Sequence, residues 1–301
     1  MRVVSLLPSA TEIVGDLGFA GLLVGRSEEC DRPAEVARLP VVSAARIDLS
    51  ALPSSAVDDA VRDAIADGRS LYAVDAELLD SLAPDLLLTQ DLCAVCAVSA
   101  GELCDAGVPT LSLDPRTLDE VAESCVAVAD ALGVPERGRA LAERMRRELE
   151  EVRELVAGLP RPRVFVAEWV DPPYAPGHWL PELVELAGGE CVLGTPGEHS
   201  FRTTWDEVRA HEPELVVLAP CGYDADRAAR EAVPPLDAAV VAVDANAFYA
   251  RPAPALALGA RQLAHLFHPD AAPDPGLPER WVRRPAARAG RAATGPSPAR
   301  R

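Results

Sequence analysis

Residues 3–25 read VVSLLPSATEIVGDLGFAGLLVG, and this stretch indicates the fold of the first half of the chain. Its two ends, 3–7 and 22–25, are short apolar runs with the length and composition of buried β-strands. A segment with helical spacing lies between them. Strand, helix and strand in this order predict a βαβ unit, and therefore a parallel sheet.

The helix of this unit is expected over residues 12–17. Ser9 or Thr11 is the candidate N-cap, because a hydroxyl there can accept a hydrogen bond from an unpaired backbone N–H of the first turn. Gly18 follows at the place where a helix would end. The chain then returns as the second strand.

The same alternation of apolar runs and amphipathic stretches continues along the chain. Further strands are expected at 86–89, 110–113, 164–167, 215–218 and 239–243. The segment 117–160, between the strand at 110–113 and the strand at 164–167, has a helical pattern almost throughout, with a break at residues 133–135. We therefore predict an N-terminal α/β lobe (1–116), a long helical connection (117–160), a C-terminal α/β lobe (161–269) and a disordered tail rich in Arg, Pro and Ala (270–301).

The composition limits the partners of the folded body. The 301 residues include 47 acidic and 29 basic residues, all of the latter arginine, so nucleic acid and anionic membranes are poor partners. Only the tail carries more basic than acidic residues. It is either a basic interaction arm or an untethered end of the chain. The sequence contains no run of about 18 apolar residues, the length that a membrane-spanning helix needs. The N-terminus lacks the pattern of a secretory signal, so we expect a cytoplasmic protein.

Several strings in order along the chain carry a family resemblance. They are residues 5–13, 24–27, 84–87, 117–121, 163–169, 179–189, 205–208 and 213–217. Together they resemble the cobalamin-binding branch of the class III substrate-binding proteins of ABC transporters. The resemblance implies two Rossmann-like lobes with parallel sheets, joined by a long helix, and a ligand cleft between the lobes.

The resemblance also implies a ligand and a partner. The ligand is cobalamin or a related corrinoid, and the partner is an ABC permease that docks on one carboxylate of each lobe, for which Glu77 and Glu207 are the candidates. In open parallel sheets, ligands bind beyond the carboxyl ends of the strands. The ligand-binding candidates of the N-terminal lobe are Pro8, Ser9, Glu29, Tyr72, Gln90 and Asp91.

The loop after the strand at 164–167 adds the candidates of the C-terminal lobe. They are Glu168, Trp169, Tyr174, His178 and Trp179. Three aromatic side chains within eleven residues offer flat apolar area for a macrocycle, in a chain with only 4% aromatic residues. A histidine in a Pro-rich loop can face a corrin ring, a metal or a substrate. Packing between the lobes is the alternative role for these side chains.

Four of the seven cysteines also fall in loops that follow strands. Cys93 and Cys96 form a Cys-x-x-Cys pair, and Cys30 and Cys221 are the candidates to complete a four-thiolate site. Such a site suits Zn²⁺ or an iron–sulfur cluster. Thiol chemistry without a metal and inert packing are the alternatives.

The residues therefore leave three functions open. The first is an intracellular binding protein for cobalamin or a related corrinoid, the second a metalloprotein or enzyme with a cysteine-held metal, and the third the solute receptor of an ABC importer. A phosphate loop, a zinc-protease motif and a nucleophile elbow are missing from the sequence. A binding protein is therefore favoured over an enzyme.

Overall fold

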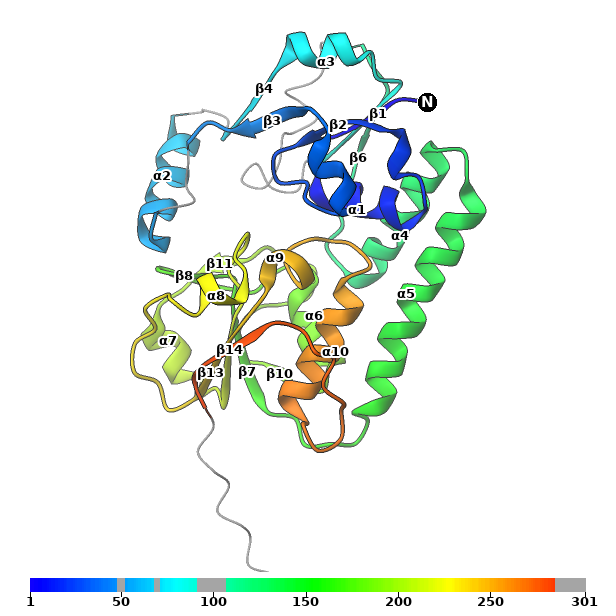
Figure 1. Cartoon of the computed structure of the whole chain (residues 1–301). Helices are drawn as coiled ribbons and strands as arrows, with labels where there is room; N and C mark the ends of the chain where they lie inside the picture. The colour runs from blue at the N-terminus through cyan, green and yellow to red at the C-terminus, as the bar shows by residue number, and fades with distance from the viewer. Residues whose placement is uncertain (48–51, 68–70, 91–106, 285–301) are drawn as a thin grey trace, which may run out of the picture.

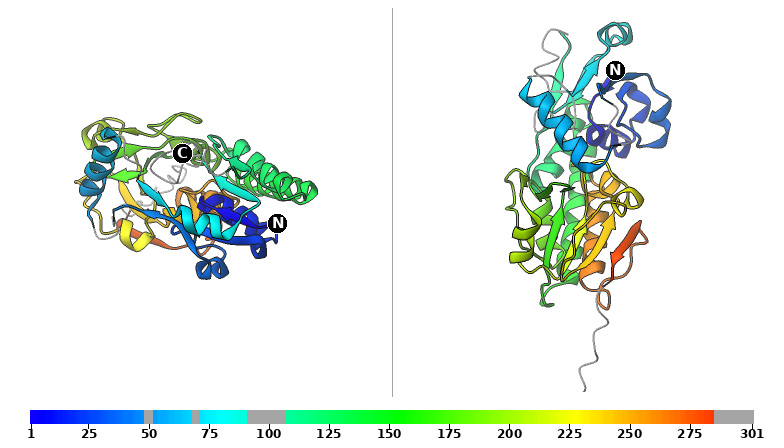
Figure 2. Two further views of the ribbon diagram at one scale, coloured as in Figure 1. Left: turned by 90° about the horizontal axis from the view of Figure 1, so that it is seen from above. Right: turned by 90° about the vertical axis from the view of Figure 1, so that its left-hand side faces the viewer.

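The structure is a computed structural model, and it describes residues 1–47, 52–67, 71–90 and 107–284. Within these ranges the chain forms two α/β lobes, one above the other in Figure 1, with a pair of helices along one side. The side view in Figure 2 shows the same stacking of the lobes. The predicted fold class, two α/β lobes rich in parallel strands, is confirmed.

The N-terminal lobe is built on a sheet with the strand order β4-β3-β2-β1-β5-β6. The strands are β1 (Val3–Ser5), β2 (Leu23–Ser27), β3 (Val41–Ala45), β4 (Tyr72–Val74), β5 (Leu86–Thr89) and β6 (Thr110–Ser112). All neighbours are parallel except β3 and β4. The helices are α1 (Pro8–Asp16), α2 (Ser54–Ala66) and α3 (Ala76–Leu82), with short 3₁₀ turns at Ala20–Leu22 and Ala34–Arg38.

The helical connection is a pair of antiparallel helices, α4 (Leu118–Ala131) and α5 (Pro135–Leu155). A capping box begins α4: the Thr117 hydroxyl accepts from the N–H of Glu120, whose carboxylate accepts from the N–H of Thr117. Gly133 follows α4 with a φ of +75°, which suits a residue without Cβ. Pro135 then takes the first position of α5, where its missing N–H costs no bond.

The C-terminal lobe contains a five-stranded sheet in the order β10-β7-β12-β13-β14 and a small antiparallel sheet in the order β11-β9-β8. The strands are β7 (Arg163–Ala167), β8 (Trp169–Val170), β9 (Pro173–Ala175), β10 (Glu190–Cys191), β11 (Phe201–Arg202), β12 (Leu215–Leu218), β13 (Ala239–Val243) and β14 (Glu279–Arg283). The helices are α6 (Leu180–Leu186), α7 (Trp205–Ala210), α8 (Ala225–Ala228), α9 (Ala245–Phe248) and α10 (Leu256–Phe267).

The first helix begins earlier than predicted, and neither Ser9 nor Thr11 is its N-cap. Leu7 is the N-cap, and Pro8 occupies the first helical position, where its fixed φ already fits a helix. The Thr11 hydroxyl instead donates to Ser5 Oγ at 2.8 Å. Thr11 therefore makes a tertiary contact here instead of capping the helix.

The predicted disordered tail also begins too early. Glu279–Arg283 form β14, which pairs antiparallel with β13 and places Trp281 opposite Val241. The composition of this segment has no strand signal, because its order comes from pairing with a buried strand that lies far away in the sequence. Residues 285–301 lie outside the described part of the chain.

One continuous hydrophobic core extends across both lobes on the side of the connecting helices. It includes Ile13 and Val14 of α1, passes through α4 and α5, and reaches Leu183 of α6 and Leu263 of α10. Smaller cores lie on the opposite faces of the two sheets. In the described ranges, no helix is both long and apolar enough to cross a membrane.

Candidate functional site

Residues that follow the strands of the C-terminal lobe meet helix α2 of the N-terminal lobe. Trp169 comes two residues after β7, and its indole N–H donates to the carbonyl of Ser54 at 3.0 Å. The Tyr174 hydroxyl on β9 donates to Asp58 of α2 at 3.0 Å. Both aromatic side chains are half-buried. Two of the predicted ligand-binding residues therefore lie where the lobes approach each other.

Glu168 organises the loop that carries these aromatic residues. Its carboxylate accepts a hydrogen bond from the N–H of Gly177 at 2.8 Å, and its carbonyl accepts from the N–H of Cys221 at 3.2 Å. A Cβ at Gly177 would lie 2.1 Å from the backbone nitrogen of Ser200, so only glycine fits there. Glu168 thus holds the loop between β7 and α6 in shape.

His178 lies in the same loop with a φ of +51°, a conformation that residues with a Cβ rarely adopt. Its Nε2 is 3.2 Å from Nδ1 of His199, which the sequence did not single out. Burial, with smaller contributions from His199 and Arg116, lowers the pKa of His178 to about 4. The imidazole is therefore neutral at neutral pH. In this form one ring nitrogen carries a proton and the other carries a lone pair.

Trp179 is a core residue in this structure. Its side chain is 6% exposed, belongs to the continuous core, and donates from Nε1 to the carbonyl of Tyr249 at 2.8 Å. The sequence placed it beside Trp169 as a ligand contact because both share one aromatic loop. The loop ends at Trp179, however, which is the N-cap of α6 and faces inward.

The N-terminal lobe brings some of its predicted residues together and separates others. Pro8, Ser9 and Gln90 are buried beyond the carboxyl ends of β1 and β5, and the Ser9 hydroxyl has no hydrogen-bond partner among the described residues. Glu29 is exposed in the loop after β2. Tyr72 lies on the edge strand β4 and packs against the smaller core of this lobe. Asp91 lies outside the described residues.

The structure gives no support to the four-cysteine site within the residues it describes. Cys30 is fully buried, and its sulfur lies 3.0 Å from Thr11 Oγ1, within hydrogen-bond distance. Cys221 is exposed, and Cys93 and Cys96 lie outside the described ranges. No group of three His, Cys, Asp or Glu side chains in those ranges is arranged to hold a metal ion.

Iodoacetamide is expected to alkylate Cys221 in the native protein while Cys30, Cys125 and Cys191 stay unmodified. Burial raises the pKa of Cys30 to about 11 and of the other two to about 12, so at pH 8 few thiolates form at these sites. Peptide mass spectrometry after a short pulse measures the pattern, and the urea-unfolded protein is the control. Rapid alkylation of native Cys30 would contradict the buried thiol.

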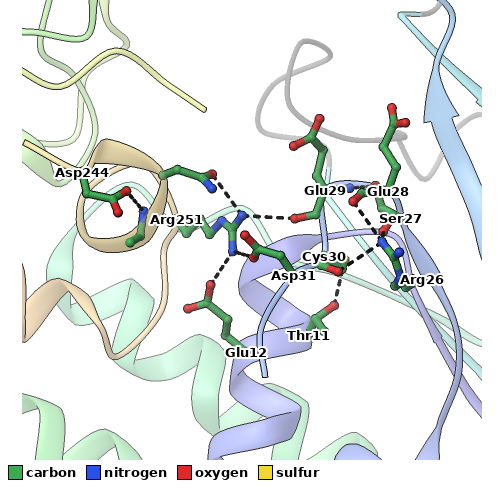
Figure 3. A network of polar contacts seen from close by, with 12 residues as sticks. Thr11, Glu12, Arg26, Ser27, Glu28, Glu29, Cys30, Asp31, Asp244 and Arg251 are labelled. Atoms are coloured by element: carbon green, nitrogen blue, oxygen red, sulfur yellow. Dashed lines mark hydrogen bonds and ion pairs between the residues drawn. The ribbon is translucent and has the colours of Figure 1, made fainter. Parts of the chain in front are cut away.

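The structure also shows a buried arginine between the lobes that the sequence analysis did not single out, because an Arg-Pro pair is typical of a turn. Arg251 is 7% exposed and links the lobes (Figure 3). Its guanidinium donates to Glu12 of α1 at 2.7 Å and to Asp31 at 2.5 Å, and also to the carbonyl of Glu29 and the amide oxygen of Asn246. Burial would lower the pKa of Arg251, but its bonds and charge contacts with Asp31 and Glu12 raise it above its usual value.

Comparison with known proteins agrees with this architecture. A family model described as periplasmic binding protein matches residues 3–233. The vitamin B12-binding protein of Yersinia pestis (strain Pestoides F) is 24% identical over 271 residues, which cover 87% of this chain and 84% of that protein.

Two solved structures share the fold. The periplasmic vitamin B12-binding protein of Vibrio cholerae has a TM-score of 0.66 at 22% identity and covers 88% of this chain and 96% of its own. A periplasmic haem-binding protein from Pseudomonas aeruginosa has a TM-score of 0.69 at 20% identity, and the match covers 94% of this chain and 95% of that protein. Given the match of the family model over most of its length, this chain belongs to the periplasmic binding protein family, in the two-lobed class III form.

Proposed function

We propose that this binding protein takes cobalamin or a related corrinoid between its lobes. The observation that carries the proposal is the pair of half-buried aromatic side chains, Trp169 and Tyr174, at the contact between the C-terminal lobe and α2. Aromatic area at the meeting of two domains suits a large, flat ligand. The names of the Yersinia and Vibrio relatives support the same class of ligand.

Haem is the second candidate, because the site also offers groups that ligate iron. Tyrosine and histidine are common axial ligands of haem iron, and the low pKa of His178 keeps its imidazole neutral. The fold neighbour from Pseudomonas aeruginosa is a haem-binding protein. One set of titrations distinguishes the two macrocycles.

The purified protein is expected to bind cyanocobalamin with a stoichiometry of one, and to bind hemin more weakly. Isothermal titration calorimetry and the absorption spectrum measure both, and metal analysis of the protein as isolated reports cobalt, iron and zinc. Tighter binding of hemin would make haem the ligand. Iron or zinc that is lost on Cys93→Ser, without any macrocycle, would favour the cysteine-held metal instead.

A permease partner belongs to the third of the functions above, the solute receptor of an ABC importer, whereas the cytoplasmic location belongs to the first, the intracellular binding protein. Glu77 on α3 and Glu207 on α7 are both exposed, one on each lobe, as docking carboxylates for an ABC permease need to be. Glu207 also accepts a hydrogen bond from the Thr203 hydroxyl at 2.7 Å, which orients its carboxylate. Permease docking and the cytoplasmic location stay predictions.

A further inference from the structure

Both terminal nitrogens of the Arg251 guanidinium are engaged by acceptors within the protein, so this arginine is not available to an anionic ligand. Glu12, with a side chain 8% exposed, and Asp31 both accept from Nη1, while the carbonyl of Glu29 and the amide oxygen of Asn246 accept from Nη2. Burial raises the pKa of Glu12, against the attraction of Arg251. We call these five residues the Arg251 clasp.

The clasp connects elements from both lobes at one edge of the molecule. Glu12 lies on α1 and Asp31 in the loop after β2, whereas Asn246 lies on α9 and Arg251 follows that helix. Next to them, the guanidinium of Arg32 lies over the ring of Phe248, 5.3 Å from its centroid. This edge is therefore held by several contacts between the lobes.

Both sides of the clasp are attached to the continuous core. On the N-terminal side, Ile13 and Val14 of α1 belong to it, and on the C-terminal side so do Ala245 and Tyr249. A movement that separated the clasp would have to shift α1 or α9 within closely packed surroundings. It would also leave the buried carboxylate of Glu12 without its cation, which is strongly unfavourable.

The opposite edge of the lobe contact is fastened differently. Figures 1 and 2 show α2 at the far end of the N-terminal lobe from the connecting helices. It contacts the other lobe through Ser54 and Asp58, which bond Trp169, Tyr174 and Glu231. Val57 and Ala64 of α2 are buried, but they belong to none of the three hydrophobic clusters of the described residues. These contacts can therefore break without separating the continuous core.

We propose that the Arg251 clasp keeps the two lobes together at the α1–α9 edge whether or not ligand is bound, and that the lobes open at the α2 edge. The clasp and the connecting helices then act as the fixed side of a hinge. Ligand enters beside Trp169 and Tyr174, and the bonds to α2 form again on closure.

Distance distributions in the ligand-free protein test this asymmetry without any assumption about the ligand. Two pairs of spin labels, attached to genetically encoded azido residues to avoid the native cysteines, are measured by pulsed electron resonance. One pair replaces Glu35 and Leu258 across the clasp edge, and the other replaces Asp59 and Phe201 across the α2 edge. We expect a narrow distribution at the clasp and a broad one at α2.

Arg251→Gln is expected to broaden the distribution across the clasp to the width seen across α2. Because this variant leaves Glu12 buried without a cation, the double variant Arg251→Met with Glu12→Gln removes both charges and serves if the single variant does not fold. Arg261→Gln is the matched control, since it removes an exposed arginine pair with Glu151 on the connecting helix.

Two results would overturn the proposal. One is an equally broad distribution at both edges of the unaltered protein. The other is a folded variant, single or double, whose clasp distribution stays as narrow as that of the Arg261→Gln control. Neither result bears on whether cobalamin binds, so the proposed function can stand or fall by itself.

Discussion

Replacing Trp179 by alanine is expected to lower the free energy of unfolding by about 3–5 kcal/mol, the usual cost of removing a large aromatic side chain from a packed core. The ring is 6% exposed, and its N–H bonds the carbonyl of Tyr249, which would lose this partner. Urea unfolding followed by circular dichroism measures the change. Cobalamin affinity of the folded fraction should stay within about threefold, because a residue remote from the ligand contributes little to binding.

Trp179→Phe is the control for this variant. It keeps most of the apolar contact and loses the N–H, so the expected loss is about 1–2 kcal/mol. The opposite outcome, unchanged stability with a large loss of cobalamin affinity, would restore Trp179 to the ligand-binding role that the sequence predicted.

Trp169→Ala is expected to weaken cobalamin binding by about 10- to 100-fold. Aromatic residues at the centre of a binding contact often contribute about 1.4–3 kcal/mol to the free energy of binding. The side chain is half-buried against Tyr223, with ring centroids 5.3 Å apart, and bonds Ser54 of the other lobe. Calorimetric titration of the folded variant measures the loss. Trp281→Ala on β14 is the matched control and should bind as the unaltered protein does.

Tyr174→Phe separates two explanations for such a loss. It keeps the ring but removes the hydroxyl that donates to Asp58 on α2. A small effect of this variant beside a large effect of Trp169→Ala would assign the binding energy to aromatic contact. If Trp169→Ala also bound cobalamin normally, the aromatic loop would not be the ligand site.

The strands of the parallel sheets could be predicted because each is a short apolar run buried on both faces. The residues of β5, β12 and β13 match the predicted runs, and all of them are buried. Strands at or next to a sheet edge can lack this pattern: β4 at the edge and β3 beside it are only partly buried, and β14 at the edge of the other sheet alternates between half-buried and exposed residues. Their order depends on the neighbouring strand, which a local pattern does not report.

The candidate site was predictable in part, for a related reason. Loop residues directly after a strand, such as Trp169, are placed by the sheet, so position along the chain was sufficient. Arg251 was not identified, because its acidic partners are Glu12 and Asp31, 239 and 220 residues away in the sequence. A buried ion pair between lobes leaves no local signal, and an Arg-Pro pair reads as an ordinary turn.

The antiparallel strand β14 has a consequence for how copies of this protein behave toward one another. It covers the edge of β13, a strand of five buried apolar residues whose free backbone groups would otherwise accept a strand from another molecule. In exchange it presents an edge that carries the charges of Arg280 and Arg283. We therefore expect β14 to protect the sheet from uncontrolled self-association, and a chain shortened before Glu279 to lose that protection.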